Sequence, residues 1–210
     1  MARVSQAHLD ARRRQILDGA RRCFTRNGFH ATSMQDVFKE TGLSSGAVYR
    51  YFRGKNELIR AVAEEAFDRM RLAFESAGRE APLRPLDEVI DGVLTRALEE
   101  QARRAGTDRP GAFAELILQV WSETLRDESL AATLHALYDR MRVMWVVVVR
   151  TYQDAGHLRA DVPADHVVRV LMALIQGFIV QRAVFKDVGG ELSSGLRALL
   201  SPEADPHYRG

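Results

Sequence analysis

Apolar residues recur at spacings of three and four along nearly the whole 210-residue chain, and this helical period restricts the fold more than any other feature. The stretch VMWVVVV, residues 143–149, has strand character when taken alone. It nevertheless continues the helical pattern of the residues before it, and no other segment offers a partner strand. We therefore predict an all-α protein of about nine helices. The predicted helices span about residues 7–27, 33–42, 44 or 45 onward, 55–77, 86–105, 111–125, 128–153, 163–186 and 191–200.

Charge is distributed unevenly along the chain, although the net charge is only +2. Residues 1–60 contain 12 Lys and Arg against 5 Asp and Glu, a net charge of +7, whereas residues 61–210 contain 18 against 23, a net charge of −5. This division indicates that the N-terminal quarter faces a polyanion. The alternative is that the basic residues only form a solvated face of the first helix. The N-terminus lacks the apolar core of a secretory signal, and no apolar run approaches the roughly 18 residues of a membrane span. We expect a cytoplasmic protein.

The stretch TGLSSGAVYRYFRGKNEL, residues 41–58, combines small residues with two tyrosines and a lysine. Gly42 suits the tight turn of a helix-turn-helix, because glycine tolerates a left-handed backbone conformation. At 100° per residue, Val48 and Phe52 share an inner face of the third helix, while Gly46 and Arg50 lie opposite. The outward surface of that helix is nearly flat. Such a surface can enter the major groove of DNA, with tyrosine hydroxyls and a lysine reaching phosphates at its edges.

These residues are part of a longer signature. The stretch NGFHATSMQDVFKETGLSSGAVYRYFRGKNEL resembles the N-terminal signature of tetracycline-repressor-type (TetR family) transcriptional regulators. The likeness lies in the glycine after the first helix, the Thr-Ser that opens the second, the glycine turn, and the patterns Ser-x-Gly-x-x-Tyr-x-Tyr-Phe and Lys-x-x-Leu. It covers about residues 10–65. The resemblance implies a helix-turn-helix DNA-binding domain at residues 1–54 and a ligand-binding and dimerisation domain at residues 55–210, with the helix 55–77 as connector.

The resemblance also implies which residues contact DNA. The bases would face Ser45, Gly46, Ala47 and Arg50, and the phosphate backbone would face Tyr49, Tyr51 and Lys55. The start of the second helix would add contacts. The full set is Thr32, Ser33, Gln35, Ser44, Ser45, Gly46, Ala47, Tyr49, Arg50, Tyr51 and Lys55. Phe38 and Thr41 replace residues that are usually alanine in the family, so the second helix is expected to pack differently on the first.

The segment VVRVLMALIQGFIVQRAVF is apolar on more than one helical face. That excess favours a partner helix, and Gly177 would permit close approach. By family likeness this helix and the last one would form a four-helix interface in a homodimer. The candidate interface residues are Leu171, Leu174, Ile175, Phe178, Ile179 and Arg182. A helix fully buried within one chain is the alternative.

Aromatic and thioether side chains concentrate in the helices that would surround a ligand cavity in this family. The candidates are Phe113, Trp121, Tyr138, Met141, Trp145 and Phe178, with Met144 beside them. The polar candidates for orienting a ligand are Gln119, His135, Arg142 and Gln176. We expect a small, mostly hydrophobic effector that releases operator DNA from a repressor. Ordinary core packing is the alternative for each of these residues.

Two other classes of function compete with DNA binding. A thiol-based redox sensor would use Cys23, the single cysteine, whose neighbours include several arginines. The place of Cys23 on an apolar stripe favours a buried and inert thiol instead. A helical interaction protein that does not bind DNA would lack salt-sensitive association with duplexes. The histidine spacings match no metal site, and no phosphate-binding glycine loop is present, so we expect neither an enzyme nor a cofactor.

Overall fold

The computed structural model describes residues 6–200 except residues 78, 81, 108, 110 and 187–190. Within that part of the chain every regular element is a helix, which confirms the predicted all-α fold. The helices are α1 (Gln6–Asn27), α2 (Met34–Thr41), α3 (Ser45–Tyr49), α4 (Lys55–Ala77), α5 (Leu86–Arg104), α6 (Ala112–Glu123), α7 (Glu128–Asp154), α8 (Ala164–Val184) and α9 (Glu191–Leu200). Residues 143–149 lie inside α7, where Met144, Trp145, Val148 and Val149 are buried on one side of the helix. Val143 and Val147 are exposed on the other side.

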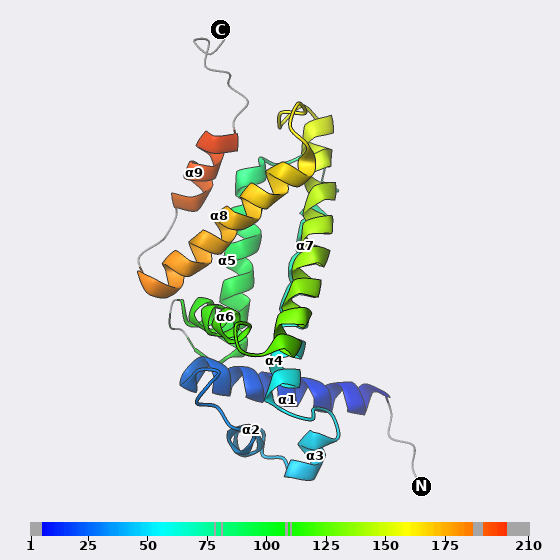
Figure 1. Ribbon diagram of the computed structural model, residues 1–210. Helices are drawn as coiled ribbons and strands as arrows, with labels where there is room; N and C mark the ends of the chain where they lie inside the picture. Colours follow the sequence, from blue (N-terminus) through cyan, green and yellow to red (C-terminus); the bar gives the residue numbers. More distant parts are fainter. Residues whose placement is uncertain are drawn as a thin grey trace.

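The helices form two layers that meet at α1 (Figure 1). Helices α2 and α3 lie on one side of α1, and helices α4 to α9 rise from its other side. One cluster of buried side chains runs through this junction, from Leu17 and Phe24 of α1 to Leu58 of α4 and Phe113 of α6. The hydrophobic interior is therefore continuous across the predicted division at residues 54 and 55. That division stays a prediction.

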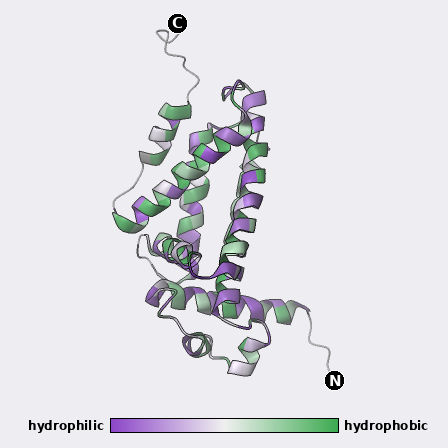
Figure 2. Ribbon diagram, in the orientation of Figure 1, coloured by the Kyte–Doolittle hydropathy of each residue, from purple (hydrophilic) through white to green (hydrophobic). Residues whose placement is uncertain are grey.

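A second cluster of buried side chains fills the far end of the helical body. It centres on Trp145, which packs on Phe74 with ring centroids 4.3 Å apart. Figure 2 shows apolar and polar residues alternating along the helices of this body. Among the described helices, α8 alone has the length and hydropathy of a membrane span, a test that core helices of soluble proteins also pass. In this fold α8 packs against α6 and α7.

Polar contacts tie α1 to the helical body. The Arg21 side chain is fully buried, and its guanidinium lies 2.6 Å from Asp18 Oδ1 and 3.0 Å from Glu65 Oε2 of α4. Arg13 also reaches Glu65, at 3.4 Å. A buried ion pair costs desolvation energy, and removing one partner strands the other charge at a cost of about 3–5 kcal/mol. The pairing therefore fixes the orientation of α1 on α4.

Candidate DNA-binding surface and internal cavity

The local sequence sets the geometry of α2 and α3. Ser33 caps α2: its hydroxyl accepts from the Asp36 amide at 3.2 Å, and the Ser33 amide donates to Asp36 Oδ2 at 2.8 Å. The Ser33 hydrogen bonds hold the pKa of the Asp36 carboxyl below its usual value. At the other end of α2, Gly42 has a φ of 67°, the left-handed conformation expected for the turn. Ser44 then caps α3.

The outer face of α3 carries little side-chain volume. Val48 and Phe52 point inward and are buried, whereas Ser44, Ser45, Gly46 and Arg50 are exposed and Ala47 is half-buried. A Cβ atom added at Gly46 would meet no heavy atom within 4 Å. Within the described residues no carboxylate pairs with the Arg50 or Arg53 guanidinium. This face offers free hydrogen-bonding groups and positive charge on a surface flat enough to meet a groove.

Among the residues predicted at the phosphate backbone, Tyr49 is 49% exposed and meets Phe38 edge-on, with ring centroids 5.4 Å apart. Phe38, the departure from the usual alanine, thus supports the ring of Tyr49. Tyr51 is half-buried. The Lys55 ammonium donates to the carbonyl oxygens of Phe29 at 2.9 Å and His30 at 3.2 Å, and lies over the Phe29 ring. Lys55 therefore holds the α1–α2 loop in this structure.

The residues predicted at the start of α2 divide into two groups. Ser33 and Gln35 are exposed beside α3. Thr32 is buried, with 2% exposure, and its hydroxyl donates to the carbonyl oxygens of Gly28 at 2.7 Å and Cys23 at 3.2 Å. The Thr32 hydroxyl therefore closes the α1–α2 loop from inside and is turned away from the surface.

Cys23 is fully buried on the apolar side of α1. Burial, followed by the charge of Glu40, raises the pKa of the thiol, which disfavours the thiolate that oxidants attack. The environment of Cys23 is that of a packing residue, and the redox-sensor alternative is not favoured.

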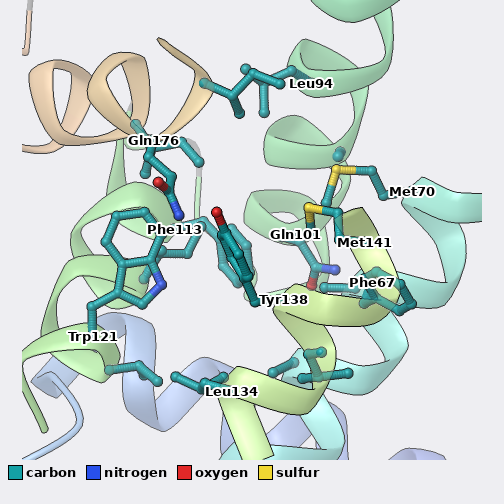
Figure 3. A pocket seen from close by; sticks show the side chains of 18 of the residues that line it. Phe67, Met70, Leu94, Gln101, Phe113, Trp121, Leu134, Tyr138, Met141 and Gln176 are labelled. Carbon is teal, nitrogen blue, oxygen red and sulfur yellow. The ribbon is translucent and has the colours of Figure 1, made fainter. Parts of the chain in front are cut away.

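A cavity of about 380 Å³ lies among α4, α5, α6, α7 and α8 (Figure 3). Apolar and aromatic side chains make up most of its wall. The groups with polar atoms on the wall are Gln101, Trp121, Thr124, His135, Tyr138 and Gln176. No Asp, Glu, Lys or Arg is among the lining residues that the structure describes. A cavity of this size and lining suits a small, mostly apolar molecule.

The cavity brings together most of the predicted ligand residues. Its wall includes Phe113, Trp121, Tyr138, Met141 and Trp145, together with His135 and Gln176. Phe178 and Met144 do not line it and are buried in the core. Gln119 points to the α1–α2 loop instead, where its Oε1 accepts from the Phe29 amide at 2.7 Å. Arg142 pairs with Asp165 at the start of α8.

The sequence analysis named no cavity residue from α4 or α5. Phe67, Met70 and Phe74 of α4 line the cavity, as do Leu94 and Gln101 of α5. The apolar stripe of α4 was visible in its period, but the same period describes residues that pack on a core. Gln101 gave a possible signal, because it is a polar residue on the inner face of α5.

The predicted interface residues lie along one side of α8, and that side is turned toward the rest of the chain. Leu171, Phe178 and Ile179 are buried within the chain, and Leu174, Ile175 and Arg182 are half-buried. The outer side of α8 instead exposes Val170, Ala173 and Val184, with Val170 61% and Val184 52% exposed. Val170 and Val184 therefore present apolar surface to solvent in the single chain.

Comparison with known proteins agrees with both parts of the fold. Residues 16–62 match the model of bacterial regulatory proteins of the tetR family, and residues 89–203 match the C-terminal model of BetI-type transcriptional repressors. An HTH-type transcriptional repressor of Mycobacterium tuberculosis is 33% identical over 190 residues, covering 89% of this chain and 90% of that protein. The HTH-type transcriptional regulator UidR of Escherichia coli K12 is 26% identical over 201 residues, covering 93% and 94% of the two chains.

Solved structures share the fold at lower identity. Salmonella enterica GusR superposes with a TM-score of 0.71 at 24% identity, covering 94% of this chain and 96% of that one. A SmeT–triclosan complex superposes with a TM-score of 0.70 at 21% identity, covering 92% and 93% of the two chains. The matches span the helix-turn-helix and the helical body alike, and the chain belongs to the TetR family of DNA-binding transcriptional regulators.

Proposed function

We propose that this regulator is a cytoplasmic repressor that binds operator DNA as a homodimer and releases it when a small, mostly hydrophobic effector fills the cavity. The bare outer face of α3 carries the DNA-binding part of the proposal. Ser45, Gly46, Ala47 and Arg50 would face the bases, and Tyr49 with Tyr51 would contact the phosphate backbone. Ser33, Gln35 and Ser44 would add contacts at the helix starts, where free amides favour phosphate. Thr32 and Lys55 would act by holding the loop between α1 and α2.

The largely apolar cavity, whose described wall carries no Asp, Glu, Lys or Arg, supports an effector. Its wall includes α4, which connects directly to the helix-turn-helix, and α6, which contacts the α1–α2 loop through Gln119. An effector that favours one arrangement of these helices changes the distance between the two recognition helices of a dimer, and operator half-sites fix that distance. Coupling of this kind is worth about 1–3 kcal/mol in other systems. Relatives named repressors and a neighbour solved with triclosan support the same proposal.

The DNA-binding face is tested by adding bulk where the fold leaves space. Gly46→Leu is expected to weaken binding to a duplex selected from a random library by at least about 100-fold, because the leucine would hold α3 away from the bases. Folding should be unaffected within about 0.5 kcal/mol, since the position is open. Fluorescence anisotropy at several salt concentrations measures the affinity and its salt dependence.

Ala136→Leu adds similar bulk to an exposed position of α7 and is the matched control. It should bind the duplex as the unmodified protein does. Unchanged DNA affinity of a folded Gly46→Leu variant would exclude α3 as the recognition helix.

A further inference from the structure

Gln101 is a buried polar residue that the fold itself does not satisfy. Its side chain projects from the last turns of α5 with 2% exposure, and its Oε1 atom has no hydrogen-bond partner. The residue also lines the cavity. In Figure 3 its amide points into the space beside Phe67, Tyr138 and Met141.

An unpaired carbonyl oxygen in an apolar enclosure is costly, because it has lost its bonds to water and gained nothing in return. Leucine or methionine would fill the same place on α5 without that cost. A molecule that donates a hydrogen bond to Gln101 Oε1 removes the penalty when it binds. A molecule of the same shape without a donor leaves the penalty in place, so the cavity discriminates between the two.

The absence of charge on the described wall restricts the ligand further. A carboxylate or an ammonium group would enter the cavity without a counter-charge, and transfer of an unpaired ion from water into such surroundings is strongly unfavourable. His135 is the one histidine among the described wall residues, and it is exposed. The wall therefore favours neutral molecules.

We propose that the effector is a neutral, largely aromatic molecule with a hydrogen-bond donor, such as a phenolic hydroxyl, placed on Gln101 Oε1. The inference rests on the proposed effector function of the cavity and names the chemistry of its ligand. Phe67, Tyr138 and Met141 surround the Gln101 amide and supply faces for a ring to stack on. The other cavity amide, Gln176, lies with Trp121 on the far side of Tyr138 in that view and provides an internal control.

Four probes of nearly one shape separate the possibilities: 4-hydroxybiphenyl, 4-methoxybiphenyl, biphenyl-4-carboxylate and biphenyl-4-ylmethylammonium. Calorimetry on the full-length protein is expected to give a dissociation constant about tenfold lower for the hydroxyl than for the methoxy probe, equivalent to about 1.4 kcal/mol. Both charged probes should bind more weakly than either neutral one. Gln101→Leu should reduce the tenfold preference to within about twofold, and Gln176→Leu should leave it intact.

A ligand-free measurement tests the same atom. Because replacement of an unpaired buried polar group by an apolar one of similar shape removes a penalty, Gln101→Leu should unfold in urea at a midpoint no lower than that of the unmodified protein. A lower midpoint would show that the amide is satisfied in the fold and would overturn the inference.

The outcomes distinguish this inference from the proposed function. Equal affinity for the two neutral probes, or loss of the preference in Gln176→Leu instead of Gln101→Leu, overturns the role of Gln101 and leaves an apolar effector in place. Tightest binding of either charged probe overturns the neutral chemistry. If no probe binds while the protein still binds duplex DNA, the proposed effector function fails, and the inference fails with it.

Discussion

At the scale of single residues, the contact between α1 and α2 shows how a departure from the family pattern is accommodated. Thr41 is buried where alanine is usual, and its hydroxyl donates to the Val37 carbonyl oxygen at 2.8 Å. Its methyl group fills the space above Gly19: a Cβ atom added at Gly19 would lie 2.4 Å from Thr41 Cγ2. The glycine on one helix and the threonine on the other therefore fit as a pair.

This fit predicts strong coupling between the two positions. Gly19→Ala alone should destabilise the protein by about 1–3 kcal/mol, because the new methyl overlaps Thr41. In Gly19→Ala/Thr41→Ala the overlap is gone and alanine favours the helix, so the double variant should be more stable than the sum of the single changes predicts. Urea unfolding of the four proteins measures the coupling. Additive free energies would contradict the proposed fit.

The Ser33–Asp36 capping box predicts a pH effect of defined sign. The Ser33 hydrogen bonds lower the folded-state pKa of Asp36 below its ordinary value of 3.8, so the ionised carboxylate stabilises the folded state. That contribution is present above the ordinary pKa and is lost as pH falls through the lower folded value. The melting temperature of Asp36→Asn should therefore lie below that of the unmodified protein at pH 7, and the difference should shrink as pH falls below 3.8, the ordinary pKa of the carboxyl. Thermal scans across this range measure it, and a difference that grows in acid would contradict the assignment.

At the scale of helices, α6 has two functional faces. One face lines the cavity through Phe113, Leu116 and Trp121. The other contacts the α1–α2 loop, where Gln119 accepts from the Phe29 amide and Glu123 Oε2 lies 3.0 Å from His30 Nε2. A shift of α6 on ligand binding would reach the helix-turn-helix through these contacts as well as through α4.

Gln119→Leu is expected to weaken the coupling between the cavity and the DNA-binding surface. The Phe29 amide loses its acceptor, so the ratio of duplex affinities without and with 4-hydroxybiphenyl should fall severalfold toward one. The affinity for 4-hydroxybiphenyl itself should change little, because Gln119 is not on the cavity wall. Anisotropy titrations with and without the probe measure the ratio.

Gln15→Leu is the matched control, because the Gln15 side chain also bonds to the backbone: its Nε2 donates to the Thr41 carbonyl oxygen, within the DNA-binding part. It should retain the ratio. If Gln119→Leu retained it too, the α6 contact would not transmit the signal.

The helices themselves were predictable from local signals. The apolar period identifies a helix, and capping residues such as Ser33, Gly42 and Ser44 mark where it begins or ends. It was harder to predict which helices line the cavity and which only pack on the core. A side chain that packs on a core and one that faces a cavity follow the same period, so the cavity residues of α4 and α5 were not singled out. The unpaired state of Gln101 depends on side chains of other helices, such as Phe67 of α4 and Met141 of α7, that offer it no hydrogen-bond donor. The contacts of Lys55 and Thr32 likewise depend on the conformation of the α1–α2 loop, which the local sequence pattern does not give.

At the scale of the whole molecule, α8 is the helix through which the proposed dimer would form. Apolar residues occupy more than one side of this helix. The sequence therefore indicated more apolar surface than one core contact needs, without showing which side is internal. In the fold, Leu171, Phe178 and Ile179 are internal, and the outer side with Val170, Ala173 and Val184 remains for a partner. A dimer formed through this side is isologous, so each substitution acts twice.

Val170→Glu is therefore expected to convert the proposed dimer into monomers at micromolar concentration, because two carboxylates would be buried against apolar surface. The affinity for operator DNA should fall as well, because a monomer cannot bind two half-sites at once. Analytical ultracentrifugation measures the assembly. Leu125→Glu, at an apolar residue 87% exposed after α6, is the control and should remain dimeric. A dimeric Val170→Glu protein would place the interface elsewhere.

The two tryptophans of the chain, Trp121 and Trp145, both lie on the wall of the cavity. The ultraviolet emission of the unlabelled protein therefore originates next to the space that an effector would occupy. Compounds that enter should shift or quench that emission directly. Libraries of candidate inducers could thus be screened optically with the purified protein alone, before any promoter is known.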